Sequence, residues 1–188
     1  MRRRGIEIER KYRLRTAPSA ALLSAHDATA LRIEQVYLRL VPGTDARRIR
    51  RTTRDDGSVE LVGTEKASLG PGTLARRERE WPLDATGYDA LLAEADPTLR
   101  PVRKTRHVVA HGEQQLEIDV FEEPPGLVVV EVELEDDDEP VALPAWLGEW
   151  VEVTEDRRYL NAVLAHPAAE IPPWPEDRTP RARVSSAR

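Results

Sequence analysis

Charged and apolar residues alternate along the stretch from Gly5 to Arg13, which reads G-I-E-I-E-R-K-Y-R. Glu7, Glu9 and Lys11 fall on one side of this stretch, whereas the other side is mostly apolar. Side chains repeat every two residues in an extended strand, so the pattern predicts a β-strand with two carboxylates and an ammonium in a row. A half-exposed antiparallel sheet also has charged faces of this kind. Whether this charged face is functional or simply exposed to solvent therefore depends on whether other strands carry matching charged faces.

Seven further segments alternate in the same way, and we expect each to form a strand. They are residues 32–41, 47–53, 58–67, 74–83, 102–110, 115–121 and 127–135. The sequence Asp55-Asp56-Gly57 separates two of these segments and is a hairpin signal, because Asp-Gly supplies the positive φ values that a tight turn needs. The spacing predicts about eight strands that are mostly antiparallel.

Helical patterns are fewer than strand patterns. We expect a short helix at residues 18–23, a clearer one from Thr86 to Ala95 with Thr86 as its cap, and helical turns at 146–147 and 157–165. A chain of 188 residues is long enough for one domain with its own core. We therefore predict a single domain over residues 1–165 and a mobile tail, containing proline and arginine, over residues 166–188.

The composition excludes several classes of protein. The net charge of −6 argues against general nucleic-acid binding, and the absence of cysteine excludes disulfides, thiolate metal sites and a cysteine nucleophile. No apolar run approaches the ~20 residues of a membrane helix, and charged residues follow the basic start where a signal peptide would be apolar. No Gly-rich loop of the G-x-x-x-x-G-K-[ST] type is present. We expect a cytoplasmic protein with neither a membrane nor a nucleic-acid partner.

The charged rows of the expected strands contain both signs. Taken together they hold seven basic and eight acidic side chains. The basic ones are Lys11, Arg48, Arg50, Lys66, Arg76, Lys104 and Arg106, and the acidic ones are Glu7, Glu9, Glu78, Glu80, Glu117, Asp119, Glu131 and Glu133. A sheet closed on itself would gather all of them around one polar lumen, with helices over the apolar outside. The alternative, an ordinary surface laced with salt bridges, stays open at this point.

Burying this many charges is costly unless they are paired or hold ligands. Carboxylate oxygens without cysteine or a histidine pair suit a hard cation, Mg²⁺ or Mn²⁺. Clustered arginine and lysine match a polyanion, because guanidinium groups pair with phosphate oxygens. A lumen of this kind would hold a metal-bound chain of phosphates.

The motifs, in their order along the chain, resemble those of the CYTH, or triphosphate tunnel metalloenzyme, superfamily. They are E-I-E-R-K at 7–11, R-I-R at 48–50, T-E-K at 64–66, R-R-E-R-E at 76–80, K-T-R at 104–106, L-E-I-D-V-F at 116–121, V-E-V-E-L at 130–134 and V-T-E-D-R-R-Y-L-N at 153–161. The last of these resembles the closing segment of short bacterial members. The resemblance extends from about Ile6 to Ala165, and the tail lies outside it.

The resemblance implies a mainly β fold, a closed eight-stranded antiparallel β-barrel that forms a tunnel, with a few covering helices. It also implies roles for the charged residues. Metal ligands would be Glu7, Glu9, Glu131 and Glu133; phosphate-binding residues would be Lys11, Arg48, Arg50, Lys66, Arg76, Lys104 and Arg106; and Glu78, Glu80, Glu117 and Asp119 would bind the metal or lie beside its ligands. Lys66 and Glu9 are our candidates for the catalytic residues, Lys66 by orienting the attacking water.

The resemblance further implies Mg²⁺- or Mn²⁺-dependent hydrolysis or cyclisation of a small molecule that bears a triphosphate. Our leading hypothesis is an inorganic triphosphatase that cleaves tripolyphosphate to pyrophosphate and phosphate. Thiamine triphosphatase and adenylate cyclase are alternatives, but an aromatic content of 5% mildly favours the inorganic substrate. A polyphosphate-binding module without activity is an alternative of another class, although it would not need the acidic rows. The sequence leaves open whether the protein forms a homodimer.

Overall fold

The structure is a computed structural model, and it describes residues 6–68, 70, 76–136 and 138–174. Its strands are β1 (Ile6–Glu7), β2 (Glu9–Leu14), β3 (Thr29–Tyr37), β4 (Ala46–Arg54), β5 (Val59–Ser68), β6 (Arg76–Pro82), β7 (Val102–His111), β8 (Gln114–Phe121), β9 (Val128–Glu133) and β10 (Trp150–Glu152). Its helices are α1 (Ala20–Ala25), α2 (Ala85–Leu92) and α3 (Asn161–Leu164), with 3-10 turns η1 (Ala145–Leu147) and η2 (Arg157–Tyr159).

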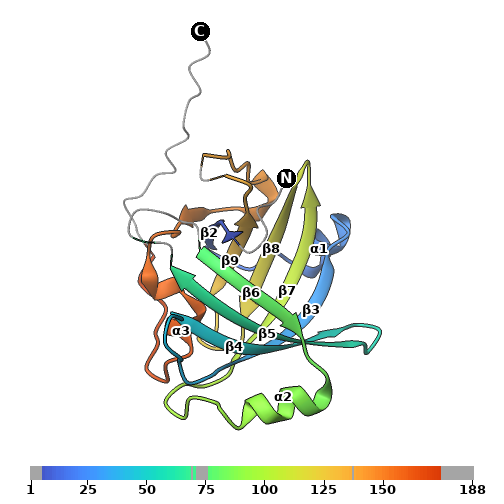
Figure 1. Ribbon diagram of the computed structural model, residues 1–188. Helices are drawn as coiled ribbons and strands as arrows, with labels where there is room; N and C mark the ends of the chain where they lie inside the picture. The colour runs from blue at the N-terminus through green and yellow to red at the C-terminus, as the bar shows by residue number, and fades with distance from the viewer. Residues whose placement is uncertain (1–5, 69, 71–75, 137, 175–188) are drawn as a thin grey trace.

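The strands form one antiparallel sheet in the order β1-β6-β5-β4-β3-β7-β8-β9-β2-β10. β1 and β2 are consecutive parts of one chain segment divided at Ile8, so β6 and β9 both pair with that segment. With β1 and β2 counted together and short β10 left out, eight strands of the described chain surround a common interior. In Figure 1, β4, β5 and β6 cross in front of β7, β8 and β9. The predicted eight-stranded antiparallel barrel is confirmed, although the covalent chain at Ile8, not an unbroken ladder of hydrogen bonds, completes the circuit.

Helices cover the outside of the barrel, as predicted. One apolar cluster combines the outward side chains of β2, β8 and β9 with Leu23 of α1 and Leu147 of η1. A second joins Val36 and Ile49, from β3 and β4, to Tyr88 of α2. Burial of these apolar side chains supplies the main drive for folding. It also leaves the charged rows of the same strands facing inward.

A third apolar cluster lies inside one end of the barrel. It joins Tyr37 of β3 and Val129 of β9 to Tyr159 and Leu164 of the C-terminal segment. Arg13, the next position after Glu9 and Lys11 on the inner face of β2, donates hydrogen bonds to the Tyr159 hydroxyl at 3.0 Å and to the Pro172 carbonyl at 2.5 Å. The C-terminal segment is thus part of the barrel's interior.

Several local predictions need correction. Asp84, not Thr86, caps α2, because its side chain accepts a hydrogen bond from the Gly87 amide. The helix expected over 157–165 is split into η2 and α3 by Leu160, whose backbone is extended. Strand β3 ends at Tyr37, short of the expected 41.

The tail expected from His166 onward is described as far as Trp174. Ile171 and Trp174 lie against the third apolar cluster. The Trp174 ring also receives the guanidinium groups of Arg13 and Arg15, at 5.2 and 5.3 Å from its centroid. These contacts hold residues 171–174 against the barrel, and the rest of the predicted tail, 175–188, lies outside the described residues. No helix of the described chain is long and apolar enough to cross a membrane.

Candidate active site

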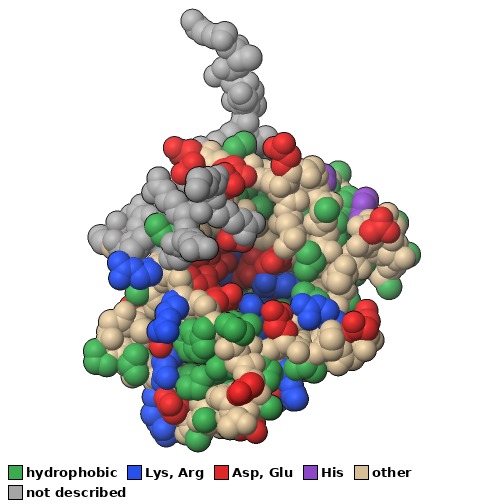
Figure 2. All heavy atoms as spheres, turned by 45° about the vertical axis from the view of Figure 1, so that its right-hand side comes forward, with side chains coloured by type: hydrophobic (Ala, Val, Ile, Leu, Met, Phe, Trp, Pro, Cys, Tyr) green, Lys and Arg blue, Asp and Glu red, His purple; other side chains and the backbone are tan. Residues whose placement is uncertain are grey.

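A cavity of about 1620 Å³ occupies the barrel interior and reaches the C-terminal segment. Figure 2 shows acidic and basic side chains side by side in a hollow on this face of the molecule. Nine of the residues proposed from the sequence line it: Glu7, Glu9, Lys11, Arg48, Lys66, Arg106, Glu117, Glu131 and Glu133. Period-two alternation therefore identified most of the charged lining.

Five other predicted residues are not part of this lining: Arg50, Glu78, Glu80, Lys104 and Asp119. Glu78 and Asp119 contact lining residues directly, Glu78 through Arg48 and Lys66 and Asp119 through Arg106. Arg50 pairs with Glu80, and Lys104 pairs with Asp119. The side chain of the remaining one, Arg76 at the start of β6, is outside the described residues. The closed barrel thus brings the acidic and basic rows together, as the sequence predicted.

One side of the interior, made by β2, β7, β8 and β9, is closely ion-paired, and we call it the paired wall. Its charged members are Lys11, Lys104, Arg106, Glu117, Asp119 and Glu131. Arg106 donates to both carboxylate oxygens of Asp119 at 2.7 Å each, to Glu131 at 2.6 Å and also to Glu117. Lys11 bridges Glu131 to Glu9, the latter at 3.1 Å. Each charge on this wall already has a protein partner.

Lys104 occupies the deepest position of the paired wall. Its ammonium bonds to Asp119, and both side chains are 0% exposed. Burial lowers the pKa of Lys104, and Asp119 only partly opposes this. The resemblance implied that Lys104 binds phosphate, yet in this structure it faces Asp119 and the Phe121 ring, 5.2 Å from the ring centroid, and does not line the cavity.

The opposite side of the interior, made by β3, β4, β5 and β6, is less fully paired, and we call it the open wall. Its polar members are Gln35, Tyr37, Arg48, Arg50, Lys66, Glu78 and Glu80. Arg48 approaches Glu78 only to 4.0 Å, and Arg50 approaches Glu80 to 3.6 Å. The Nε atoms of both arginines are buried without a hydrogen-bond partner. This wall therefore keeps donor capacity unused.

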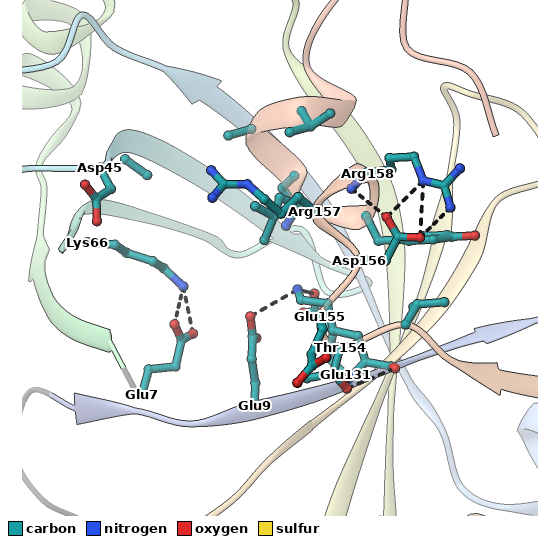
Figure 3. A pocket seen from close by; sticks show the side chains of 18 of the residues that line it. Glu7, Glu9, Asp45, Lys66, Glu131, Thr154, Glu155, Asp156, Arg157 and Arg158 are labelled. Atoms are coloured by element: carbon teal, nitrogen blue, oxygen red, sulfur yellow. Dashed lines mark hydrogen bonds and ion pairs between the residues drawn. The ribbon is translucent and has the colours of Figure 1, made fainter. Parts of the chain in front are cut away.

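Lys66 is the closely bonded residue of the open wall. Its ammonium reaches the two carboxylate oxygens of Glu7 at 2.7 and 2.5 Å (Figure 3). It also lies 3.6 Å from a carboxylate oxygen of Glu78. Burial opposes ionisation of Glu7, but Lys66 and Arg48 outweigh it and lower the pKa of Glu7. Burial raises the pKa of Glu78 to about 7; Lys66 lowers it, and the neighbouring Glu7 carboxylate raises it further. The pKa values of the two carboxyl groups therefore differ. Near neutral pH Glu7 is ionised and Glu78 is half-protonated.

For Lys11 and Glu131, the neighbouring charges of the paired wall favour the ionised form. Burial disfavours the Lys11 ammonium, but Glu131 and Glu9 overcome this and raise the pKa of Lys11 above its usual value. Likewise, Lys11, Lys104 and Arg106 overcome burial and hold the pKa of Glu131 well below its usual value. These groups stay ionised across the physiological pH range, which suits a fixed electrostatic frame.

The metal prediction rests on the four glutamates Glu7, Glu9, Glu131 and Glu133. Glu9 and Glu133 are direct partners across β2 and β9, and oxygen donors of this type fit Mg²⁺ or Mn²⁺. Within the described residues, however, no three acidic or histidine side chains gather in a way that could hold a metal ion. Glu7 is held by Lys66, and both Glu9 and Glu131 by Lys11. The donor chemistry fits a hard cation, and Glu7, whose two oxygens both contact Lys66, is the carboxylate that would have to exchange a lysine for the metal.

Sequence reasoning missed two groups of lining residues. Gln35 lies on the inner face of β3 beside Tyr37, and both residues line the cavity. Residues 154–158 also line the cavity, and Figure 3 shows Thr154 to Arg158 along one side of it. These five form no alternating strand. Their only signal was the closing motif V-T-E-D-R-R-Y-L-N.

A closed antiparallel barrel with acidic and basic rows facing one cavity is the architecture that the sequence motifs implied. Residues 5–162 match the family model of the CYTH domain, and the chain belongs to this family.

Individual relatives are more specific. The chain is 37% identical over 163 residues to the inorganic triphosphatase of Nitrosomonas europaea, a match that covers 85% of this chain and 96% of the relative. The crystal structure of the inorganic triphosphatase NE1496 is similar with a TM-score of 0.54 and 32% identity, covering 88% of this chain and 96% of that one. The PH1819 protein from Pyrococcus horikoshii shares the fold at 22% identity and a TM-score of 0.50, with 71% of this chain and 81% of that chain covered.

Proposed function

We propose that this protein is an inorganic triphosphatase that hydrolyses tripolyphosphate to pyrophosphate and phosphate. The observation that carries the proposal is the similarity, at 37% identity over nearly the whole relative, to an inorganic triphosphatase. The cavity supports it independently, because Lys11, Arg48 and Arg106 line one interior together with several carboxylates. Guanidinium and ammonium groups bind phosphate oxygens, whereas a purely anion-binding surface has no use for acidic rows.

The open wall is the surface that would bind the phosphate chain. Arg48 has an unused donor and lines the cavity together with Lys66. Arg50, the next inner residue of β4, also has an unused donor. Arg106, on the paired wall, would bind from the opposite side. Phosphoryl transfer depends mainly on positioning and on electrostatic stabilisation, so fixed cations on two sides of a linear substrate are suited to the reaction.

For the metal, we propose Mg²⁺ or Mn²⁺ held by Glu7, Glu9, Glu131 and Glu133. A cation bound there supplies positive charge to the phosphate oxygens and lowers the pKa of a bound water. If Glu7 held the cation, Lys66, which lies against Glu7 here, would be released. Its ammonium would then orient the attacking water or neutralise charge on the phosphate, the role that makes Lys66 our leading catalytic candidate, with Glu9.

The direct test is a substrate panel. Wild-type protein is assayed with tripolyphosphate, ATP, thiamine triphosphate and pyrophosphate, each with Mg²⁺ and with Mn²⁺, while both phosphate and cyclic AMP are measured. We expect tripolyphosphate to be the best substrate and cyclic AMP to be absent. Cyclic AMP as the main product would make the protein a cyclase, preferred release of phosphate from thiamine triphosphate would make it a thiamine triphosphatase, and absence of turnover would leave a binding module.

A variant of the acidic row tests the site itself. Glu9→Ala removes a proposed metal ligand and catalytic residue, and we expect it to abolish metal-dependent phosphate release. Glu135→Ala, two residues beyond the end of β9, removes a glutamate that is not among the proposed site residues and should keep full activity. Full activity in Glu9→Ala would show that the site has been assigned wrongly.

A further inference from the structure

Gln35 is a buried, neutral amide in an otherwise charged interior. It lies on the inner face of β3, lines the cavity and is 2% exposed. Its Oε1 atom has no hydrogen-bond partner. Buried polar groups of folded proteins are nearly always hydrogen-bonded, so an exception calls for an explanation.

The neighbours of Gln35 share this property. Across β4 its direct partner is Arg50, and the next inner residue along the strand is Arg48, opposite Tyr37. The Nε atoms of both arginines are buried and without partners as well. Three buried polar atoms without hydrogen-bond partners, Gln35 Oε1 and the Nε atoms of Arg48 and Arg50, thus occupy adjoining positions on the open wall. Arg106 on the paired wall, by contrast, makes four ion-pair hydrogen bonds.

The chemistry of the amide suits a phosphate oxygen. A half-turn about the last side-chain bond exchanges the amide oxygen and nitrogen, so the NH₂ group can point into the cavity. It can then donate a hydrogen bond without adding positive charge to a wall that already holds two arginines and a lysine. A glutamate of the same shape would instead pair with Arg50 and take it away from the substrate.

We propose that Gln35 is a substrate-binding residue, whose amide NH₂ donates to a phosphate oxygen held by Arg48, with Arg50 beside them on β4. This inference rests on the proposed function, since it takes a linear triphosphate as the ligand. Without substrate the Oε1 atom of Gln35 has no partner, so turning the amide toward the substrate breaks no hydrogen bond at that atom.

The first test is Gln35→Leu, which keeps the volume and removes the hydrogen bond. We expect kcat/KM for tripolyphosphate to fall about tenfold, mainly through a raised KM, because the contact is made to the bound substrate. We also expect the substrate-free variant to melt at a higher temperature than the wild type, since an unsatisfied buried amide has been removed. A residue with a merely structural role would not move these two measurements in opposite directions.

Two further variants serve as controls. Gln35→Glu introduces a carboxylate beside Arg50 and should lower kcat/KM by about 100-fold. Ile33→Leu changes an apolar position two residues away on the same face and should alter neither KM nor kcat. Unchanged kcat/KM in Gln35→Leu would overturn the proposal, and so would a fall in kcat at constant KM, because that pattern belongs to a group that acts on the attacking water.

Calorimetric titration of tripolyphosphate separates failure of this inference from failure of the proposed function. If the wild type binds tripolyphosphate without hydrolysing it, the proposed function fails, and weaker binding by Gln35→Leu would still support the role of Gln35. Equal affinity of the two proteins would overturn that role. A wild type that neither binds nor hydrolyses tripolyphosphate would overturn both.

Discussion

The two walls of the barrel interior have similar side chains and different bonding. On the paired wall, Arg106 and Lys104 are bonded to carboxylates that are themselves shared with other cations. On the open wall, Arg48 and Arg50 lie 4.0 and 3.6 Å from their nearest acidic partners and keep buried Nε atoms without partners. A charged side chain that is fully paired within the protein stabilises the fold, whereas a cationic side chain with unused hydrogen-bond donors can bind a ligand. The contrast separates residues that shape the cavity from residues that would bind in it.

The largest expected effect is on stability, and it comes from replacing Lys104, the most deeply buried cation of the paired wall. Lys104→Met leaves the Asp119 carboxylate buried and without its lysine partner, and we expect a loss of about 3–5 kcal/mol in the free energy of unfolding. Urea denaturation measures this loss. On the open wall, Arg50→Gln is the matched control and should cost less than about 1 kcal/mol, because its pair is longer and partly exposed. Equal losses in the two variants would remove the distinction between the walls.

The next effect concerns activity and belongs to the open wall. Arg48→Gln should lower kcat/KM for tripolyphosphate about 100-fold, the loss expected for a charged hydrogen bond worth roughly 1.5–3 kcal/mol. Its stability should change little. Arg51→Gln, on the exposed outer face of the same strand, is the control and should behave as wild type in the phosphate-release assay. If the two variants had the same activity, Arg48 would not contact substrate.

A third prediction uses the half-protonated carboxyl of the open wall. The pKa of Glu78 is raised in the folded state to about 7, whereas an unfolded glutamate titrates near 4.5. The folded protein therefore binds the extra proton between these values, and this contribution to stability is present at low pH and is lost as the pH rises to 7.

Glu78→Gln removes that titration. Between pH 5 and pH 8 the wild type should lose about 1–3 kcal/mol more stability than the variant, measured by urea denaturation with a chelator present. Parallel pH profiles of the two proteins would mean that Glu78 is not perturbed. No comparable slope is expected from Glu131 in this range, because its pKa is held low.

The smallest effect concerns the C-terminal contact with Arg13, which shares the inner face of β2 with Lys11. Trp174→Ala removes the ring that lies against Arg13 and Arg15, and should lower the free energy of unfolding by about 1 kcal/mol. Trp174→Phe retains a smaller ring and should recover part of that loss. A Trp174→Ala variant as stable as the wild type would show that the contact is not stabilising.

The charged rows could be predicted because a strand repeats every two residues, so Glu7, Glu9 and Lys11 had to share a face. The role of each charged residue on that face could not be predicted in this way. Lys104 and Arg48 have equivalent places in their rows, but one is bonded to a buried aspartate and the other is not, a difference set by which strands meet when the barrel closes. Gln35 carries no charge and gave no signal in a pattern built from charges. The residues that follow β10 line the cavity through tertiary contacts that no periodicity records.

The arrangement of the first strand has a consequence for how the chain folds. The segment from Ile6 to Leu14 pairs with β6 on one side, with β9 on the other and finally with β10, so its hydrogen bonds are completed by residues as distant as Glu152. Contacts between such distant residues slow folding. During synthesis, Glu7 can pair only after Arg76 has left the ribosome, and Glu9 only after Glu133. The proposed metal-binding strand is therefore the part of this protein most exposed to misassociation before the barrel closes.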